Sequence, residues 1–151
     1  MHIQLEIERA ASALHVQLAL INETDRDGVR EKALHDFVTQ PFHFRWLWEH
    51  LIDCENINDP EGWKYIDEFV NKKRVVLFFN EFEDKSMFEL DGSRLTELIG
   101  ECYGFEFYVT DAAADFLICY NHHDCLFATG TAKNWLANKI TTIRPSNQPS
   151  E

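Results

Sequence analysis

The sequence is short of positive charge: it holds 14 Lys and Arg residues against 26 Asp and Glu, a formal net charge of −12. Both halves of the chain are acidic. A field of this sign repels phosphate backbones, and no basic stripe offsets it, so we expect no binding to nucleic acid or to an anionic membrane surface. The same field favours a basic protein partner, because long-range attraction speeds encounter. Acidity that only keeps the protein soluble is the alternative.

Long apolar runs are also missing. No window approaches the roughly 20 apolar residues that span a bilayer, and the first ten residues have neither the basic start nor the apolar stretch of a signal peptide. The four cysteines, Cys54, Cys102, Cys119 and Cys125, are scattered and lie mostly among apolar residues. This pattern is typical of buried thiols in a reducing compartment, so we expect a cytoplasmic protein.

Motifs of common enzyme classes are absent: the chain has no GxSxG, no P-loop and no GxGxxG. Cys119 and Cys125 bracket two histidines, and a Cys–His pair can form an activated thiolate. Both cysteines sit inside apolar runs, however, where a thiol is usually a small core residue. The sequence therefore favours a non-enzymatic protein without a cofactor and leaves enzymatic activity as the alternative.

The composition fits one domain. With 151 residues, 45% of them hydrophobic, and with twelve Phe and four Trp, the chain is long enough to bury a well-packed core. We expect a single α+β domain over residues 1–144, followed by a disordered polar tail over residues 145–151.

Helices are expected first along the chain. The spacing of apolar residues predicts one helix over residues 3–21 and a second over about 28–39, with Asp27 as its N-cap. Asp59 and Pro60 are typical of the start of a further helix, which carries Trp63, Ile66, Phe69 and Val70 on its apolar side.

Residues 42–54 fit two structures. Phe42, Phe44, Trp46 and Trp48 alternate with other residues, as in a strand, yet apolar residues also fall on one helical face. We favour a helix from Phe44 to Asp53, because a short apolar run does not decide the period alone.

The second half predicts a mixed sheet of about four strands. Residues 74–79 form a continuous apolar run, which is typical of a central strand buried on both faces. The other strands are expected at 87–90, at 105–109 and in a C-terminal β-hairpin of residues 116–120 and 125–129, with helices at 94–103 and 131–138. If the strand at 105–109 were a parallel neighbour of the strand before helix 94–103, the connection would be right-handed.

The hairpin tip, Asn121-His122-His123-Asp124, concentrates polar chemistry. His and Asp are ligands for zinc and other divalent metals, so a metal-binding or metal-dependent hydrolytic site at His122, His123 and Asp124 is one hypothesis. Adjacent side chains on an extended backbone point in opposite directions and would converge only in a tight turn. The simpler interpretation is that Asn121 and Asp124 make turn hydrogen bonds.

The register of the hairpin depends on the length of its loop. A loop of two or four residues would pair Tyr120 with Cys125 and put Cys119 and Cys125 on opposite faces of the sheet, whereas an odd loop would place the two cysteines opposite each other.

Three groups of residues could bind a protein partner, and the first is the hairpin tip with His122, His123 and Asp124. Exposed Trp residues concentrate binding energy at interfaces, which selects Trp46 and Trp48. Clustered carboxylates suit Lys and Arg on a basic partner, which selects Glu81, Glu83 and Asp84 in the predicted loop 80–85. Burial of the rings in the core and a merely solvated acidic loop are the competing interpretations. The sequence leaves the oligomeric state open.

Residues 105–130, FEFYVTDAAADFLICYNHHDCLFATG, resemble the C-terminal core of small bacterial proteins akin to immunity proteins, which neutralise toxins in polymorphic toxin systems. Trp46-Leu47-Trp48-Glu49 and the buried strand 75–79 extend this resemblance to residues 45–130. The resemblance brings no catalytic residues. It implies a cytoplasmic, acidic binder of a toxin domain.

Overall fold

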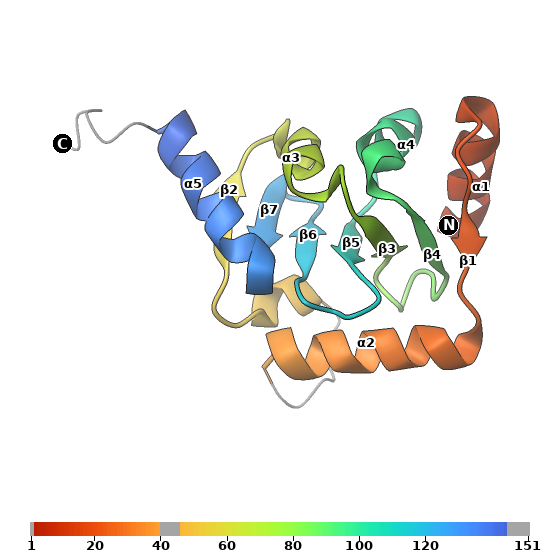
Figure 1. Cartoon of the computed structure of the whole chain (residues 1–151), viewed down its shortest axis with the longest axis horizontal. Helices are drawn as coiled ribbons and strands as arrows, with labels where there is room; N and C mark the ends of the chain where they lie inside the picture. Colours follow the sequence, from red (N-terminus) through yellow and green to blue (C-terminus); the bar gives the residue numbers. More distant parts are fainter. Residues whose placement is uncertain (1, 40–45, 145–151) are drawn as a thin grey trace.

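The computed structural model describes residues 2–39 and 46–144. In this part of the chain, seven strands form one antiparallel sheet in the order β1-β4-β3-β5-β6-β7-β2 (Figure 1). The strands are β1 (Ala19–Leu20), β2 (Glu55–Asn58), β3 (Arg74–Phe78), β4 (Met87–Asp91), β5 (Phe107–Thr110), β6 (Ile118–Tyr120) and β7 (Cys125–Ala128). The predicted α+β class is confirmed, but the sheet has seven antiparallel strands rather than about four mixed ones.

The α-helices are α1 (Ile3–Leu14), α2 (Glu23–Phe37), α3 (Asp67–Val70), α4 (Leu95–Glu101) and α5 (Lys133–Ile143). Short 3₁₀ helices are η1 (Leu47–His50), η2 (Gly62–Ile66), η3 (Gly92–Arg94) and η4 (Gly130–Ala132). α1, α3, α4 and α5 pack on one face of the sheet, which we call the four-helix face, and α2 crosses the other, the α2 face (Figure 1). Among the described residues, no helix is long and apolar enough to cross a membrane.

The central strand was predicted correctly. β3 lies between β4 and β5, and its residues 75–78 are at most 1% exposed. The connection from β4 through α4 to β5 differs from the expectation, because β4 and β5 are not neighbours: both pair with β3 in antiparallel register.

The predicted helix over residues 3–21 is wrong in its second half. α1 ends at Leu14, and His15 adopts a left-handed conformation with φ 57°. The backbone then continues into β1, the edge strand beside β4. The second helix begins earlier than expected, at Glu23, because Asn22 acts as its N-cap by accepting a hydrogen bond from the backbone N–H of Asp25.

The aromatic segment is only partly described. Phe42 and Phe44 lie outside the described residues, and the expected helix from Phe44 to Asp53 is replaced by the 3₁₀ helix η1. The helix expected after Pro60 is a 3₁₀ helix followed by the single turn α3. The predicted disordered tail, residues 145–151, also lies outside the described residues.

One edge of the sheet gathers several loops. β3 and β6 are both antiparallel to β5, so they run in the same direction and end at the same edge. The loop after β3 (residues 80–85), the turn after β6 (residues 121–124) and Glu106, just before β5, therefore lie along this edge. We call this side of the sheet, which is formed by the ends of the strands and not by an edge strand, the hairpin edge.

Candidate functional site

The turn at the hairpin edge has an odd number of residues. Tyr120 pairs with Leu126, and the backbone N–H of Asn121 donates to the carbonyl of Cys125, which leaves residues 122–124 as the loop. The loop is therefore odd, and the pairing of Tyr120 with Cys125 that an even loop would give does not occur. Cys119 and Cys125 lie on the same face, but Cys119 stands opposite Phe127 rather than opposite Cys125.

The polar residues of the turn hold it together. The side-chain oxygen of Asn121 accepts hydrogen bonds from the backbone N–H groups of His123 (2.9 Å) and Cys125 (3.0 Å). Asp124 adopts the left-handed region with φ 59°, which Asp tolerates better than most residues. The turn role expected for Asn121 is confirmed, and the tight turn is what brings the two histidines together.

The two histidine rings meet two of the predicted tryptophans on the α2 face. The ring centroids of His122 and His123 are 4.1 Å apart, and His122 lies 5.0 Å from Trp46 and 5.8 Å from Trp48. Trp48 also contacts His123 and stacks on Phe127. Four residues predicted as partner-binding, from segments some 75 positions apart in the sequence, thus form one cluster, which we call the His–Trp cluster.

A buried carboxylate lies beneath this cluster. Glu106 is 4% exposed; it accepts a hydrogen bond from the hydroxyl of Tyr108 (2.7 Å), and its other oxygen lies 3.2 Å from Nδ1 of His122. Burial raises the pKa of Glu106 above its ordinary value, although Tyr108, His122 and Trp48 each act to lower it. The buried indole N–H of Trp48 makes no hydrogen bond of normal geometry, yet it is close enough to favour the charged carboxylate.

Sequence reasoning missed Glu106. The signal was present, because a single Glu interrupts the aromatic run Phe105–Tyr108 directly before a buried strand. A carboxylate in such a run is costly to bury unless it finds partners, so its position in the sequence indicates a specific polar contact. Its partner, sixteen residues later, could not be inferred without the hairpin register.

The predicted acidic residues divide into two groups. Glu81 and Glu83 are exposed on the loop after β3, with Phe82 between them 62% exposed. Asp84 instead accepts backbone hydrogen bonds from Gln4, in the first turn of α1, and from Ser86. Partial burial acts to raise the pKa of Asp84, but these hydrogen bonds outweigh it and the net shift is downward. Asp84 therefore joins the loop to α1.

Asp124 faces away from the histidines. Its carboxylate lies 3.3 Å from the hydroxyl of Tyr120, whose ring belongs to the core of the four-helix face. Within residues 2–39 and 46–144, no group of three or more His, Cys, Asp or Glu residues is placed to hold a metal ion. The geometry thus gives the metal hypothesis no support at His122, His123 and Asp124.

The four cysteines are free thiols. Cys119 is fully buried, and burial raises its pKa well above the ordinary value. Burial also raises the pKa of Cys102 to about 12. Neither thiol is therefore an activated nucleophile at neutral pH.

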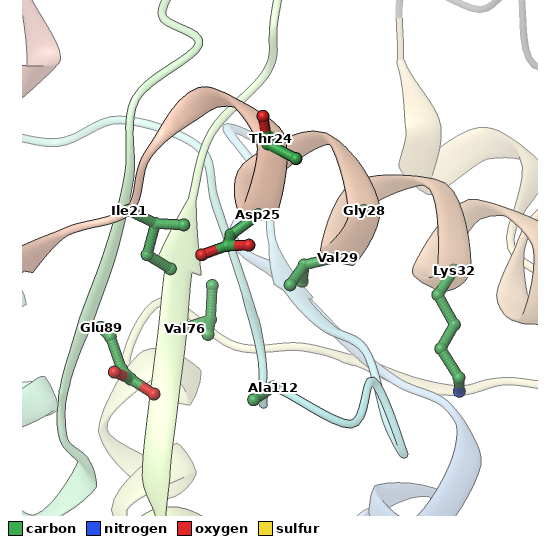
Figure 2. Close-up of a pocket in the computed structure, with 9 residues that line it drawn as sticks. All are labelled: Ile21, Thr24, Asp25, Gly28, Val29, Lys32, Val76, Glu89 and Ala112. Carbon is green, nitrogen blue, oxygen red and sulfur yellow. The ribbon is translucent and has the colours of Figure 1, made fainter.

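A cavity of about 410 Å³ lies between α2 and the sheet, away from the His–Trp cluster (Figure 2). Asp25, Glu89 and Lys32 supply its charged groups. Each already has a partner: Asn22 donates to Asp25, Arg74 pairs with Glu89, and Lys32 pairs with Asp36. Because these charged groups already have polar partners, the cavity offers a ligand less than its size suggests.

The model of a family described as "Family of unknown function (DUF6756)" matches residues 2–141. No curated protein and no solved structure matches the chain.

Proposed function

We propose that this chain, which belongs to the family of unknown function DUF6756, is a non-enzymatic module that binds a basic protein partner through the hairpin edge. The observation that carries the proposal is the gathering of Trp46, Trp48, His122 and His123 in one cluster at an edge that also holds the acidic loop 80–85. An immunity protein that occludes a basic toxin domain is the form of this function that we favour.

The exposed aromatic residues support the same surface. Among the described residues, the large hydrophobic side chains that are clearly exposed include two aromatic ones, Phe82 at 62% and Tyr103 at 46%. Phe82 belongs to the acidic loop, and Tyr103 lies between α4 and β5, close to the start of β5. Aromatic residues beside carboxylates give an interface both an apolar anchor and a charge to orient a cationic partner.

With a net charge of −12, we expect the carboxylates to act mainly on the rate of association with the partner. Exposed pairs contribute little to affinity but speed encounter with a partner of opposite charge, and salt screens this effect. We therefore expect the association rate to fall as salt rises, while the dissociation rate depends on the aromatic contacts.

The first experiment is capture of partners from native lysate on the immobilised protein at low and at high salt. We expect a basic protein that is retained at low salt and weakened at high salt, and kinetics are then measured with that purified protein. A column that retains no basic protein under either condition would contradict the proposal.

Matched charge variants test whether the carboxylates at the hairpin edge, rather than the total charge, govern the association rate. Glu81→Gln with Glu83→Gln removes two charges at the hairpin edge, and Glu31→Gln with Asp115→Asn removes two from exposed positions, Asp115 being in the loop at the opposite edge. We expect only the first pair to slow association at low salt. Equal slowing by both pairs would show that total charge, and not this edge, governs encounter.

A second pair of variants tests the cluster. His123→Ala removes a ring that packs on Trp48, whereas His35→Ala removes one that is 76% exposed on α2. Hot-spot residues cost more than about 1 kcal/mol on truncation, so His123→Ala should weaken binding about tenfold, mainly through faster dissociation. An effect no larger than that of His35→Ala would exclude the cluster from the interface.

A further inference from the structure

We propose that a second cavity, of about 240 Å³ on the four-helix face of the hairpin edge, receives a lysine or arginine side chain of the basic partner. This inference rests on the proposed function for the source of the cation. The side chains that matter are Trp63, Tyr103, Phe105, Phe107, Tyr120 and Asp124. The volume is below the range of about 300–1,000 Å³ that is usual for drug-sized ligands, and it suits a single side chain.

The cavity stands back to back with the His–Trp cluster. Phe107 and Tyr120 are paired residues of β5 and β6 whose side chains belong to the four-helix face, whereas Tyr108 and Cys119 belong to the α2 face. Asp124 comes from the same turn as His122 and His123. A partner that covers the hairpin edge would therefore reach both surfaces.

Aromatic residues from separate elements form the walls. Trp63 comes from η2, Tyr103 and Phe105 follow α4, and the rings of Tyr103 and Phe105 meet edge to face at 5.8 Å. The negative faces of such rings attract ammonium and guanidinium groups, and the attraction grows when the site is desolvated. The Nζ of Lys64 lies 5.5 Å from the centroid of the Trp63 ring, but Lys64 does not line the cavity.

Among the described residues, the charged side chain that lines the cavity is the negative one of Asp124. The hydroxyl of Tyr120 lies close to the backbone carbonyls of Asp59 (3.0 Å) and Pro60 (3.1 Å) and to the carboxylate of Asp124 (3.3 Å). Burial raises the pKa of Tyr120, and the negative charges of Asp124, Asp59 and Glu61 raise it further. No Lys or Arg of the described residues lines the cavity, so the charge of Asp124 is uncompensated from within.

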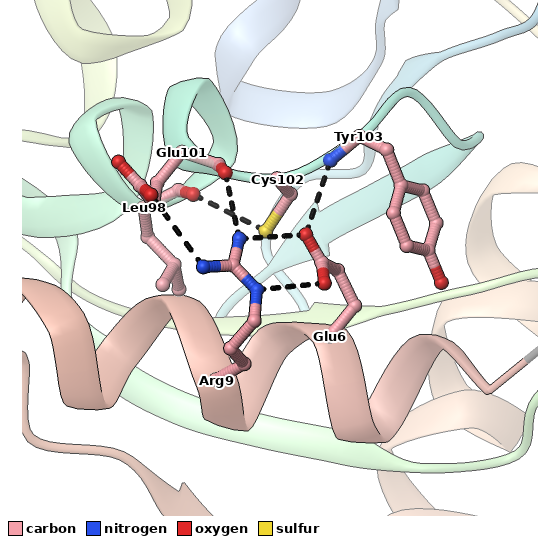
Figure 3. A network of polar contacts seen from close by, with 6 residues as sticks. All are labelled: Glu6, Arg9, Leu98, Glu101, Cys102 and Tyr103. Carbon is pink, nitrogen blue, oxygen red and sulfur yellow. Dashed lines mark hydrogen bonds and ion pairs between the residues drawn. The ribbon is translucent and has the colours of Figure 1, made fainter.

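Two features hold the walls in place. Arg9 of α1 donates to the carbonyl of Glu101 and to Glu6, and Glu6 accepts the backbone N–H of Tyr103 (Figure 3). This network fixes the chain at the end of α4, where the wall begins. Gly100 lets the ring of Trp63 lie against α4, because a Cβ at this position would come within 3.2 Å of the ring.

The test uses N-acetyl-lysine methylamide and N-acetyl-arginine methylamide as probes, with N-acetyl-norleucine methylamide as a neutral control of similar shape. Binding is followed from the NMR signal of the Trp63 indole N–H, assigned with Trp63→Phe. We expect at least one cationic probe to bind about tenfold more tightly than norleucine. Equal binding of norleucine, or no binding of either cation, would overturn the inference.

Asp124→Asn supplies the matched variant. Asn tolerates the left-handed conformation of this position, and Asp53→Asn makes the same change at another residue with positive φ, 52°, outside the cavity. We expect Asp124→Asn to weaken the cationic probe several-fold and leave norleucine unchanged, with no effect of Asp53→Asn. Equal probe affinities in the two variants would contradict the assignment.

The probes also separate this inference from the proposed function. A cavity that binds the cationic probe in a protein that retains no basic partner would keep the cation site but remove the proposed function and the partner as the source of the cation. A basic partner that binds equally well to wild type, Trp63→Phe and Asp124→Asn would overturn the inference and keep the proposed function.

Discussion

Removing the hydroxyl group of Tyr108 tests whether Glu106 is a charged group held in the core. Tyr108 is fully buried, its ring stacks on Phe78, and its hydroxyl donates to Glu106 at 2.7 Å. Tyr108→Phe keeps the ring and loses only the donor. A hydrogen bond to a charged group contributes about 1.5–3 kcal/mol to stability, and a neutral one about 0.5–1.5 kcal/mol. The cost of the substitution should therefore depend on the protonation of Glu106.

The direction of this dependence follows from the pKa of Glu106, which burial raises above the ordinary 4.5. Between the unfolded and folded pKa, the folded protein holds a proton that the unfolded chain has lost, so wild-type stability falls as pH rises through this window. The Tyr108 hydroxyl lowers the pKa of Glu106, so its removal raises that pKa further and makes the loss larger. The two stability curves should diverge as pH rises.

Urea unfolding followed by circular dichroism measures the effect. Tyr108→Phe should cost about 1 kcal/mol near pH 4 and more near pH 7.5, rising toward about 1.5–3 kcal/mol as Glu106 ionises, with an unchanged denaturant slope. In a Glu106→Gln background the cost should stay near the lower value at both pH values, because no charge remains to be stabilised.

Tyr65→Phe is the control for this prediction. It removes a hydroxyl that donates to Asp59 at 2.5 Å, and this hydrogen bond lowers the pKa of Asp59 below its ordinary 3.8. Because the pKa shift of Asp59 is downward, the stability that this hydrogen bond contributes is lost only as pH falls below the ordinary pKa, so the cost of Tyr65→Phe should change little between pH 4 and pH 7.5. A cost of Tyr108→Phe that is equally independent of pH would refute the reasoning about Glu106.

Three further predictions concern the fold. Gly92→Ala should destabilise the protein by more than about 3 kcal/mol in urea unfolding, because its Cβ would lie 2.0 Å from the carbonyl oxygen of Val70. Gly28→Ala is the control: Gly28 lies in open space on α2, so this substitution should stabilise the protein by about 0.5–1 kcal/mol. Asn22→Ala should cost about 1 kcal/mol through loss of the α2 cap, as measured by thermal unfolding. Cys119, fully buried with a raised pKa, should resist alkylation near pH 8 until urea unfolds the chain, as followed by mass spectrometry.

The elements that could be predicted from the sequence are those whose pattern is set by burial. Residues 74–79 were predicted as a central strand because both faces of β3 are covered, which makes the run apolar throughout. The hairpin could be predicted because apolar runs flank a polar turn. β2 could not, because its sequence Glu55-Asn56-Ile57-Asn58 buries only Ile57. β1 is two exposed residues that pair with β4, so the backbone and not the side chains places it.

The candidate site was predictable only in its parts. Trp46, Trp48, His122 and His123 were selected for their residue types, but their contact depends on η1 lying over the end of the hairpin. Helical spacing alone extended α1 too far, since it does not register the left-handed turn at His15. The contact between residues so far apart in the sequence depends on the order and register of the whole sheet. A local sequence pattern does not contain this information.

The length of the hairpin turn decides how the edge is divided. With three residues in the loop, Cys119, Cys125 and Phe127 share the α2 face, while Tyr120 and Leu126 share the other. A loop longer or shorter by one residue would turn one strand over and exchange these faces. Glu106 would then lose its position beneath the histidine rings, and Asp124 its position beside Tyr120. The odd turn therefore gives one sheet edge two chemically different surfaces, the His–Trp cluster on the α2 face and, on the four-helix face, a cavity lined by aromatic side chains and Asp124.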